Sequence, residues 1–188
     1  VARTREQVEA TAHGIVAAGG RAIAICADVT REDDVHRIVN DTNARLGKLD
    51  ILVGNAGMLG GLSSIAHASP SDVEDIFDVN VLANYRLLRS CDPLLRLSAS
   101  GRVTMVTSGA TRAPVPYWGP YAASKAALEH LTLTYAAEMK TTNVRVNLID
   151  PGAVATIKVE VRDPGVENEN DAKAWAINPA GIPQDPRH

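Results

Sequence analysis

The sequence predicts an α/β fold in which a doubly wound parallel sheet carries helices on both faces. Two observations support this class. Helical and extended patterns alternate along the 188 residues, which makes neighbouring strands parallel because the chain returns to the sheet through a helix. The extended stretches are apolar throughout, as expected for strands that are covered on both faces. The length suits one domain around a single core.

The first quarter of the chain predicts helix, strand and helix. A first helix ends at the glycines at 19–20, and a short apolar strand follows over 21–29. Thr30 and Asp33 suit a capping pair for a second helix that ends near Leu46. The residues expected on the inward faces of these two helices are Val8, Ala12, Ile15, Val16, Val35, Ile38 and Val39.

The rest of the chain continues the alternation. Strands are predicted over 49–57, 101–109 and 143–152. Two long helices lie between them, over 70–93 or slightly beyond and over 120–140. Each begins at a proline, which suits the first turn of a helix because a proline there loses no backbone hydrogen bond.

Composition and charge exclude several classes of protein. The net charge is −3 and no basic block occurs, so nothing draws the chain to nucleic acid or to an anionic membrane. No apolar run approaches the roughly 20 residues of a spanning helix, and no signal-peptide pattern opens the chain. The five histidines are scattered, so we predict no metal site. Cys26 and Cys91 are expected as buried, reduced thiols of a cytoplasmic protein.

The unusual polar and glycine residues gather where the predicted strands end. Asp28, Asn55, Ser108 and Pro151 each begin or lie in such a run. Because ligands of open parallel sheets bind at the carboxyl ends of the strands, the functional site is expected at this edge.

Ser108, Tyr121 and Lys125 form a candidate reaction centre. Tyr121 falls in the first turn of the 120–140 helix, and Lys125 lies four residues later on the same face. A free phenol has a pKa of about 10, so its ionisation near pH 7 requires about 4 kcal/mol in favour of phenolate. An ammonium about 5 Å away supplies roughly 3 kcal/mol, and the helix N-terminus about 0.3–1 kcal/mol. Tyr121 is therefore predicted to exchange a proton with a carbonyl or alcohol oxygen that Ser108 holds by a hydrogen bond.

The same residues have plainer explanations. A tyrosine four residues before a lysine occurs by chance in about one in three chains of this length, and an exposed surface pair would explain it. The alternation of elements argues against this, because it independently places Ser108 at a strand end and Tyr121 at the next helix start. A serine hydrolase is excluded because the TSGA run lacks the G-x-S-x-G elbow and no histidine has a partner role.

These residues resemble the short-chain dehydrogenase/reductase family, over essentially the whole chain. The resemblance implies a Rossmann-like fold, one dinucleotide-binding and catalytic domain over 1–188, and a character closest to single-domain oxoacyl reductases. Each matching piece is weak alone, but all six follow the family's order and spacing. They are DVT at Asp28, NAG at Asn55, VNV at Asn80, VTSG at Ser108, YAASK at Tyr121 and PGAVAT at Pro151.

The resemblance implies a catalytic tetrad of Asn80, Ser108, Tyr121 and Lys125. In this assignment Tyr121 is the acid and base, and Ser108 orients the substrate oxygen. Lys125 binds the nicotinamide ribose and favours the phenolate of Tyr121, while Asn80 holds a water of a proton relay. Without the resemblance, an asparagine on a helix would be taken as a surface residue.

The resemblance also implies a bound nicotinamide cofactor that touches Tyr121 and Lys125. NADP(H) is favoured over NAD(H), because Arg3 suits a 2′-phosphate and Ala2 replaces the acidic residue of NAD-preferring relatives. The alternatives are a turn-forming Asp28, a simple strand-ending turn after residue 54, and a solvated charge at Arg3. The remaining cofactor-binding positions are Asp28, Val29, Asn55, Ala56, Gly57, Pro151, Gly152, Val154 and Thr156.

The chain departs from the family's pattern at both ends. The glycine-rich turn, the first strand, nearly all of the second strand and the last strand are missing, so we expect a fragment truncated at both ends. The strand over 21–29 then lacks its neighbour, and the 188 residues alone are expected to fold weakly and to bind cofactor poorly. Residues 157–188 are expected to form a substrate lid and a truncated C-terminal segment.

The predicted function is an NAD(P)H-dependent oxidoreductase that interconverts a carbonyl and a secondary alcohol. The substrate wall is expected to be apolar and to include Ala110, Pro116, Tyr117 and Trp118. One alternative is a nucleotide-sugar epimerase or dehydratase, which shares Tyr-x-x-x-Lys but needs a larger C-terminal region. The other alternative is a catalytically inert cofactor-binding fragment or scaffold.

The two long helices carry apolar residues beyond one face. The resemblance implies a homodimer or homotetramer that pairs the helices containing Asn80 and Tyr121, and the alternative is a thick core within one monomer. The residues concerned are Leu82, Leu87, Leu88, Leu128, Leu131 and Leu133.

Overall fold

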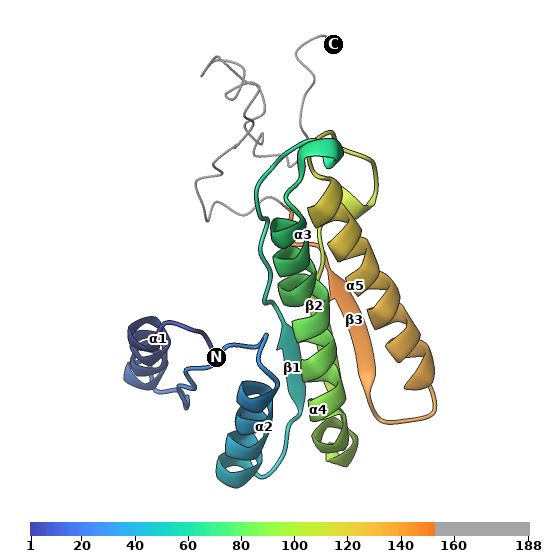
Figure 1. The fold of residues 1–188 in the computed structure, drawn as a ribbon. Helices are drawn as coiled ribbons and strands as arrows, with labels where there is room; N and C mark the ends of the chain where they lie inside the picture. The colour runs from blue at the N-terminus through green and yellow to red at the C-terminus, as the bar shows by residue number, and fades with distance from the viewer. Residues whose placement is uncertain (153–188) are drawn as a thin grey trace.

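The computed structural model describes residues 1–152. It contains a three-stranded parallel sheet in the order β1-β2-β3, formed by β1 (Ile51–Gly54), β2 (Arg102–Val106) and β3 (Arg145–Ile149). All three strands run in the same direction, so their carboxyl ends meet at one edge of the sheet (Figure 1). The strands predicted after residue 48 are confirmed, although each is shorter than its apolar run. The predicted lid over 157–188 lies outside the described residues.

Residues 1–152 also contain five α-helices, of which the first two precede β1, and three short helical turns. A π-helical turn, η2, joins α3 to α4, so the predicted helix over 70–93 is one continuous rod that ends at residue 97. The helices are α1 (Arg5–Ala17), α2 (Glu32–Leu46), α3 (Pro70–Phe77), α4 (Ala83–Leu97) and α5 (Gly119–Glu138), and the short turns are η1 (Ile65–His67), η2 (Asp78–Leu82) and η3 (Gly109–Thr111).

The main core lies between the sheet and the helices α4 and α5, which run side by side over the sheet (Figure 1). The sequence predicts cover on both faces of the sheet. Within residues 1–152, however, the alternate side chains of β1 face outward, and Ile51 and Val53 are 61% and 57% exposed. The buried residues of this core are Leu52, Leu88, Cys91, Leu95, Val103, Met105, Met139 and Val144.

The predicted strand over 21–29 is wrong for the described residues. Its one ladder contact there is an isolated bridge between Ala2 and Cys26. A strand needs a neighbour along its whole length, and without one the segment is extended but not part of a sheet. It packs instead against α2, where Ile25, Ala27 and Ile38 form a second, smaller core.

The predicted inward face of α1 is also wrong. No residue of α1 is buried, and Ile15 and Val16 are 44% and 53% exposed. Figure 1 shows α1 apart from the sheet, beside the N-terminus. An amphipathic pattern predicts which face of a helix is apolar, but burial requires a partner surface.

The predicted capping pair of α2 does not form. Arg31 occupies the N-cap position and α2 has no side-chain cap. The backbone N–H and hydroxyl of Thr30 donate instead to Asp28 Oδ1, at 3.0 and 2.8 Å. The inward face of α2 is as predicted, with Val35 and Ile38 buried.

The predicted burial of the two cysteines holds for one of them. Cys91 is buried in the main core, and this burial raises the pKa of its thiol to about 11. Cys26 is only half-buried, and its thiol donates a hydrogen bond to the carbonyl of Arg3 at 3.2 Å.

Candidate active site

Lys125 is held at the carboxyl end of β2. The helix α5 begins at Gly119 with a proline in its first turn, and Lys125 lies in its second turn, where its side chain is turned toward the sheet. Lys125 is only 4% exposed, and its ammonium donates a hydrogen bond to the carbonyl of Val106 at 2.9 Å. Burial disfavours the charged form, which lowers the pKa of Lys125.

Tyr121 lies one turn before this lysine, as the sequence predicts. Its ring packs edge-on against Trp118, with the ring centres 5.7 Å apart and the planes at 72°. The Lys125 ammonium lies 6.0 Å from the centre of the Tyr121 ring. The structure therefore brings the phenol and the amine together on the face of α5 that meets the end of β2.

Asn80 connects this helix to the loop that follows β1. It is fully buried in η2, and it exchanges two hydrogen bonds with the backbone of Met58: Oδ1 accepts at 2.7 Å and Nδ2 donates at 2.9 Å. Nδ2 also donates to the Ser124 hydroxyl at 2.8 Å, and that hydroxyl donates to the Tyr121 carbonyl at 2.7 Å. The side chain of Asn80 thus connects the loop after β1, η2 and the start of α5.

Two residues of this network, Ser124 and Asn84, escaped prediction from the sequence. Asn84 Nδ2 donates to the carbonyls of Asn80 and Ala56, at 2.9 and 3.2 Å. A π-turn breaks the regular helical hydrogen-bond ladder, so a side-chain donor that reaches its carbonyls stabilises it. The signal available in the sequence was the spacing of the two asparagines, four residues apart on one helical face.

Ser108 lies two residues after the end of β2, at the same edge of the sheet as the Lys125 ammonium. It is the N-cap residue of η3, and its hydroxyl accepts a hydrogen bond from the Ala110 N–H at 3.3 Å. Ser108 is half-buried. The predicted strand-end position of Ser108 is confirmed.

The bare backbone of Gly57 lies against the amine and the asparagine. A Cβ atom at Gly57 would come within 3.1 Å of Lys125 Nζ and 3.4 Å of Asn80 Oδ1. Of its neighbours, Asn55 is exposed and Ala56 is half-buried. The glycine therefore keeps open the space beside the ammonium.

Asp28 and Arg3 lie near each other beside the smaller core. The two hydrogen bonds from Thr30 lower the pKa of Asp28, and the nearby charge of Arg3 lowers it further. Asp28 thus forms the turn before α2, which is the plainer explanation considered for it. A contact of Asp28 and Val29 with an adenine stays a prediction.

The segment before α5 contains the predicted substrate wall. Tyr117 has a φ of 71°, an uncommon conformation for a residue other than glycine, and its side chain is exposed. Trp118 and Ala110 are half-buried. Of the remaining predicted cofactor-binding positions, Pro151 and Gly152 are exposed after β3, and Val154 and Thr156 lie outside the described residues.

The family model described as short chain dehydrogenase matches residues 1–165 of the sequence. The chain belongs to the short-chain dehydrogenase family. The resemblance inferred from the six sequence pieces is therefore confirmed, together with the Rossmann-like α/β fold.

Relatives of this short-chain dehydrogenase include the benzil reductase ((S)-benzoin forming) of Saccharomyces cerevisiae. The two are 38% identical over 134 residues, which cover 69% of this chain and 51% of the yeast protein. The chain spans about half to two thirds of the length of the curated relatives it matches.

Two solved structures place nicotinamide cofactors in the same fold. A metagenomic short-chain oxidoreductase in complex with NADP has a TM-score of 0.75 and 32% identity, over 83% of this chain and 71% of that one. An NAD⁺-bound xylitol dehydrogenase has a TM-score of 0.76 and 29% identity, over 80% of this chain and 58% of that one.

The residues of the short-chain dehydrogenase site fit a nicotinamide cofactor. An ammonium has three N–H donors, and the hydrogen bond to Val106 uses one of them. The backbone of Gly57 leaves room beside this ammonium that any side chain would fill. Lys125 can therefore donate hydrogen bonds to a ligand with hydroxyl groups, such as a ribose, at this edge of the sheet.

Metal-binding clusters and membrane-spanning helices are both absent from residues 1–152. This part of the chain holds no group of three or more His, Cys, Asp or Glu side chains placed to bind a metal ion. None of its helices combines the length and the apolar character needed to cross a bilayer.

Proposed function

We propose that this short-chain dehydrogenase is an NADP(H)-dependent oxidoreductase that interconverts a carbonyl and a secondary alcohol. The observation that carries the proposal is the position of the Lys125 ammonium. It is buried, bonded to the end of β2, next to the ring of Tyr121 and open to a ligand along the backbone of Gly57.

In this proposal Tyr121 moves the proton. An ammonium close to a phenol stabilises the phenolate, so the phenol gives its proton to a carbonyl oxygen more readily and takes it back from an alcohol. Ser108 donates a hydrogen bond to the same oxygen and holds it in place. The network through Ser124 supports Tyr121, because it fixes the first turn of α5 against Asn80.

Lys125, Gly57 and the residues beside them would hold the cofactor. When bound, the nicotinamide supplies or accepts the hydride at the substrate carbon. Lys125 donates to the ribose hydroxyls, and the segment Asn55 to Gly57 lines the crevice. Asn80 supports this crevice through Met58, and its role in a water-mediated proton relay remains part of the proposal.

The preference for NADP(H) rests on Arg3. Structural relatives include one in complex with NADP and one that is NAD⁺-bound, so membership of the family favours neither cofactor. A guanidinium suits a 2′-phosphate because it donates two parallel hydrogen bonds to phosphate oxygens. Arg3 is exposed and follows directly on the bridge between Ala2 and Cys26.

The first substrates to test are aromatic ketones and diketones. The yeast relative is named for the reduction of benzil. Trp118, beside Tyr121, offers an aromatic surface next to the proton donor, and aromatic rings pack well against each other.

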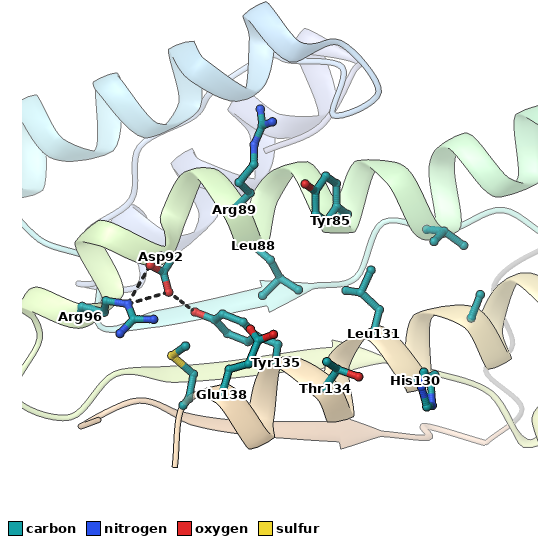
Figure 2. Close-up of a pocket in the computed structure, with 13 residues that line it drawn as sticks. Tyr85, Leu88, Arg89, Asp92, Arg96, His130, Leu131, Thr134, Tyr135 and Glu138 are labelled. Atoms are coloured by element: carbon teal, nitrogen blue, oxygen red, sulfur yellow. Dashed lines mark hydrogen bonds and ion pairs between the residues drawn. The ribbon is translucent and has the colours of Figure 1, made fainter. Parts of the chain in front are cut away.

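We further propose that the protein forms a homodimer or homotetramer through α4 and α5. A pocket of about 700 Å³ lies between these helices on the side away from the sheet, and Figure 2 shows Tyr85, Leu131 and Tyr135 at its wall. The alternative of a thick monomer core explains only part of the apolar excess. Leu87, Leu88 and Leu128 are buried, whereas Leu82 and Leu133 are exposed.

Replacing Tyr121 by phenylalanine tests the proposed function. The Tyr121→Phe variant of the full-length protein should lose about 10²- to 10⁴-fold in kcat, because it lacks the proton donor. Its affinity for NADPH should stay within about twofold, because Lys125 and Gly57 are untouched. Turnover is followed by NADPH absorbance and binding by fluorescence titration. Equal turnover by the variant and the wild type would refute the role of Tyr121.

A further inference from the structure

Glu129 links α5 to the two threonines that flank the Ser108 loop. A single oxygen of its carboxylate, Oε1, accepts hydrogen bonds from the hydroxyls of Thr107 at 2.5 Å and Thr111 at 2.9 Å. The shorter distance, from Thr107, is typical of a hydroxyl that donates to a charged oxygen. Thr107 immediately precedes Ser108 and Thr111 follows it by three residues, so the carboxylate restrains the loop on both sides of Ser108.

This restraint extends to the backbone of Ser108 through Thr111. The Thr111 hydroxyl lies 2.9 Å from Glu129 and 3.0 Å from the carbonyl of Ser108, so its one proton has an acceptor on either side. The Thr111 N–H also donates to the Ser108 carbonyl, at 3.1 Å. The position of Thr111, which Glu129 restrains, therefore restrains Ser108.

Two successive turns of α5 bind two successive residues of the chain as it leaves β2. Lys125 donates to the Val106 carbonyl, and Glu129, one turn later on the same face, accepts from the Thr107 hydroxyl. Thr107 is itself held, because its N–H donates to the Ile149 carbonyl at 2.9 Å. The next residue is Ser108, so its position relative to α5 is determined from both sides.

We propose that Glu129 is a positioning residue that holds the Ser108 loop in register with Tyr121 and Lys125. The proposal rests on the proposed function in one respect, namely that Ser108 contacts the reacting oxygen. Glu129 does not touch substrate in this proposal and acts only through the threonines. A displacement of about 1 Å in a group that orients a reacting atom can lower the rate by about 100-fold.

Amide hydrogen exchange of the full-length protein tests whether Glu129 restrains the Ser108 loop, without reference to activity. In Glu129→Ala, the amides of Ala110, Thr111 and Arg112, which bond within the loop, should exchange about tenfold faster, as expected for the loss of charge-assisted hydrogen bonds. Thr111→Val removes one of the two hydroxyls that donate to Glu129. It should give a smaller increase in the exchange rate of the same peptide. Glu74→Ala removes an exposed carboxylate from α3 and should leave this peptide unchanged.

Kinetics separate positioning from general stability. Glu129→Ala should lower kcat by about 10- to 100-fold, with KM for NADPH unchanged because Lys125 keeps its bond to Val106. Glu129→Gln retains an acceptor oxygen of the same shape and should recover most of that loss. In a Ser108→Ala background, Glu129→Ala should lower kcat no further, because the group that it positions is gone.

The outcomes distinguish this proposal from the proposed function. If the loop amides exchange at the wild-type rate in both Glu129→Ala and Thr111→Val, Glu129 does not restrain the loop, whatever the activity of the variants. Should Glu129→Ala fail to fold, Thr111→Val and Glu129→Gln decide in its place. If the loop amides of the variants exchange faster than those of the wild type while the wild type turns over no carbonyl compound, the proposed function is refuted. That result still supports the restraint of the loop by Glu129. Equal losses from Glu129→Ala with and without Ser108 refute positioning through Ser108.

Discussion

The Lys125 ammonium and the Val106 carbonyl form a 2.9 Å hydrogen bond that fixes the amine to the last residue of β2. This bond determines where the buried charge lies, since the helix alone would allow the long side chain many positions. It also holds the amine against Val106, which lies two residues before Ser108 in the chain. The strand β2 therefore determines how far the amine lies from Ser108. The helix α5 determines how far the amine lies from Tyr121.

The burial of Lys125 predicts a dependence of stability on pH. Burial lowers the pKa of Lys125 below its usual value of 10.5. Between the folded and the unfolded pKa the unfolded chain binds more protons than the folded one, so the free energy of unfolding rises with pH across this window. Lys125→Met removes this titration. We expect the stability of the wild type relative to Lys125→Met to increase as the pH is raised toward 10.5, as measured by urea unfolding.

A flat difference across that range would mean that the folded and unfolded amines titrate alike, which is incompatible with a buried ammonium. The comparison between variant and wild type removes the contribution of every other titrating group that the two proteins share. Lys140 is exposed in the turn that follows the same helix, and Lys140→Met serves as the matched control.

A side chain at Gly57 should weaken cofactor binding. In Gly57→Ala the new Cβ would lie 3.1 Å from Lys125 Nζ, closer than carbon and nitrogen normally approach, so the ammonium must move by a few tenths of an ångström. We expect the affinity for NADPH to fall by about tenfold, the loss of one hydrogen bond to a charged group, with little change in stability. Gly14→Ala in α1, where a Cβ meets nothing within 4 Å, is the control and should leave NADPH affinity unchanged.

Arg3 should determine the preference between the two nicotinamide cofactors. Arg3→Ala removes the proposed partner of the 2′-phosphate, so the KM for NADPH should rise by about 10- to 100-fold. The KM for NADH should remain within about twofold, because NADH lacks that phosphate. Steady-state kinetics with both cofactors measure the two values. A similar rise for both cofactors would show that Arg3 acts on the fold and not on the phosphate.

A charge in the pocket between α4 and α5 should dissociate the proposed oligomer. Tyr85 lines this pocket and is 43% exposed, so Tyr85→Glu places a carboxylate there without disturbing the core. An unpaired charge is costly to bury at an interface, and the variant should sediment as a monomer at concentrations where the wild type is a dimer or tetramer. Leu97→Glu, at the exposed end of the same helix and outside the pocket, should leave the assembly unchanged.

Two errors of the sequence-based prediction, the strand over 21–29 and the inward face of α1, share a physical origin. The 21–29 segment has the apolar character of a strand, but among the described residues it has only Ala2 as a ladder partner. The apolar face of α1 is likewise not covered by any other surface within residues 1–152. In both cases the local pattern was present and the partner was not, and a pattern of residues carries no information on whether its partner is there.

The sequence by itself determined the alternation of helices and strands, the family, and the separation of Tyr121 from Lys125 along one helical face. These properties depend on residues that are near each other in the chain, so spacing and periodicity reveal them. Only the tertiary structure decided which distant groups meet. Asn80 reaches Ser124 across 44 residues and Glu129 reaches Thr107 across 22, because the packing of α5 against the sheet and η2 brings them together, and no local pattern specifies that packing.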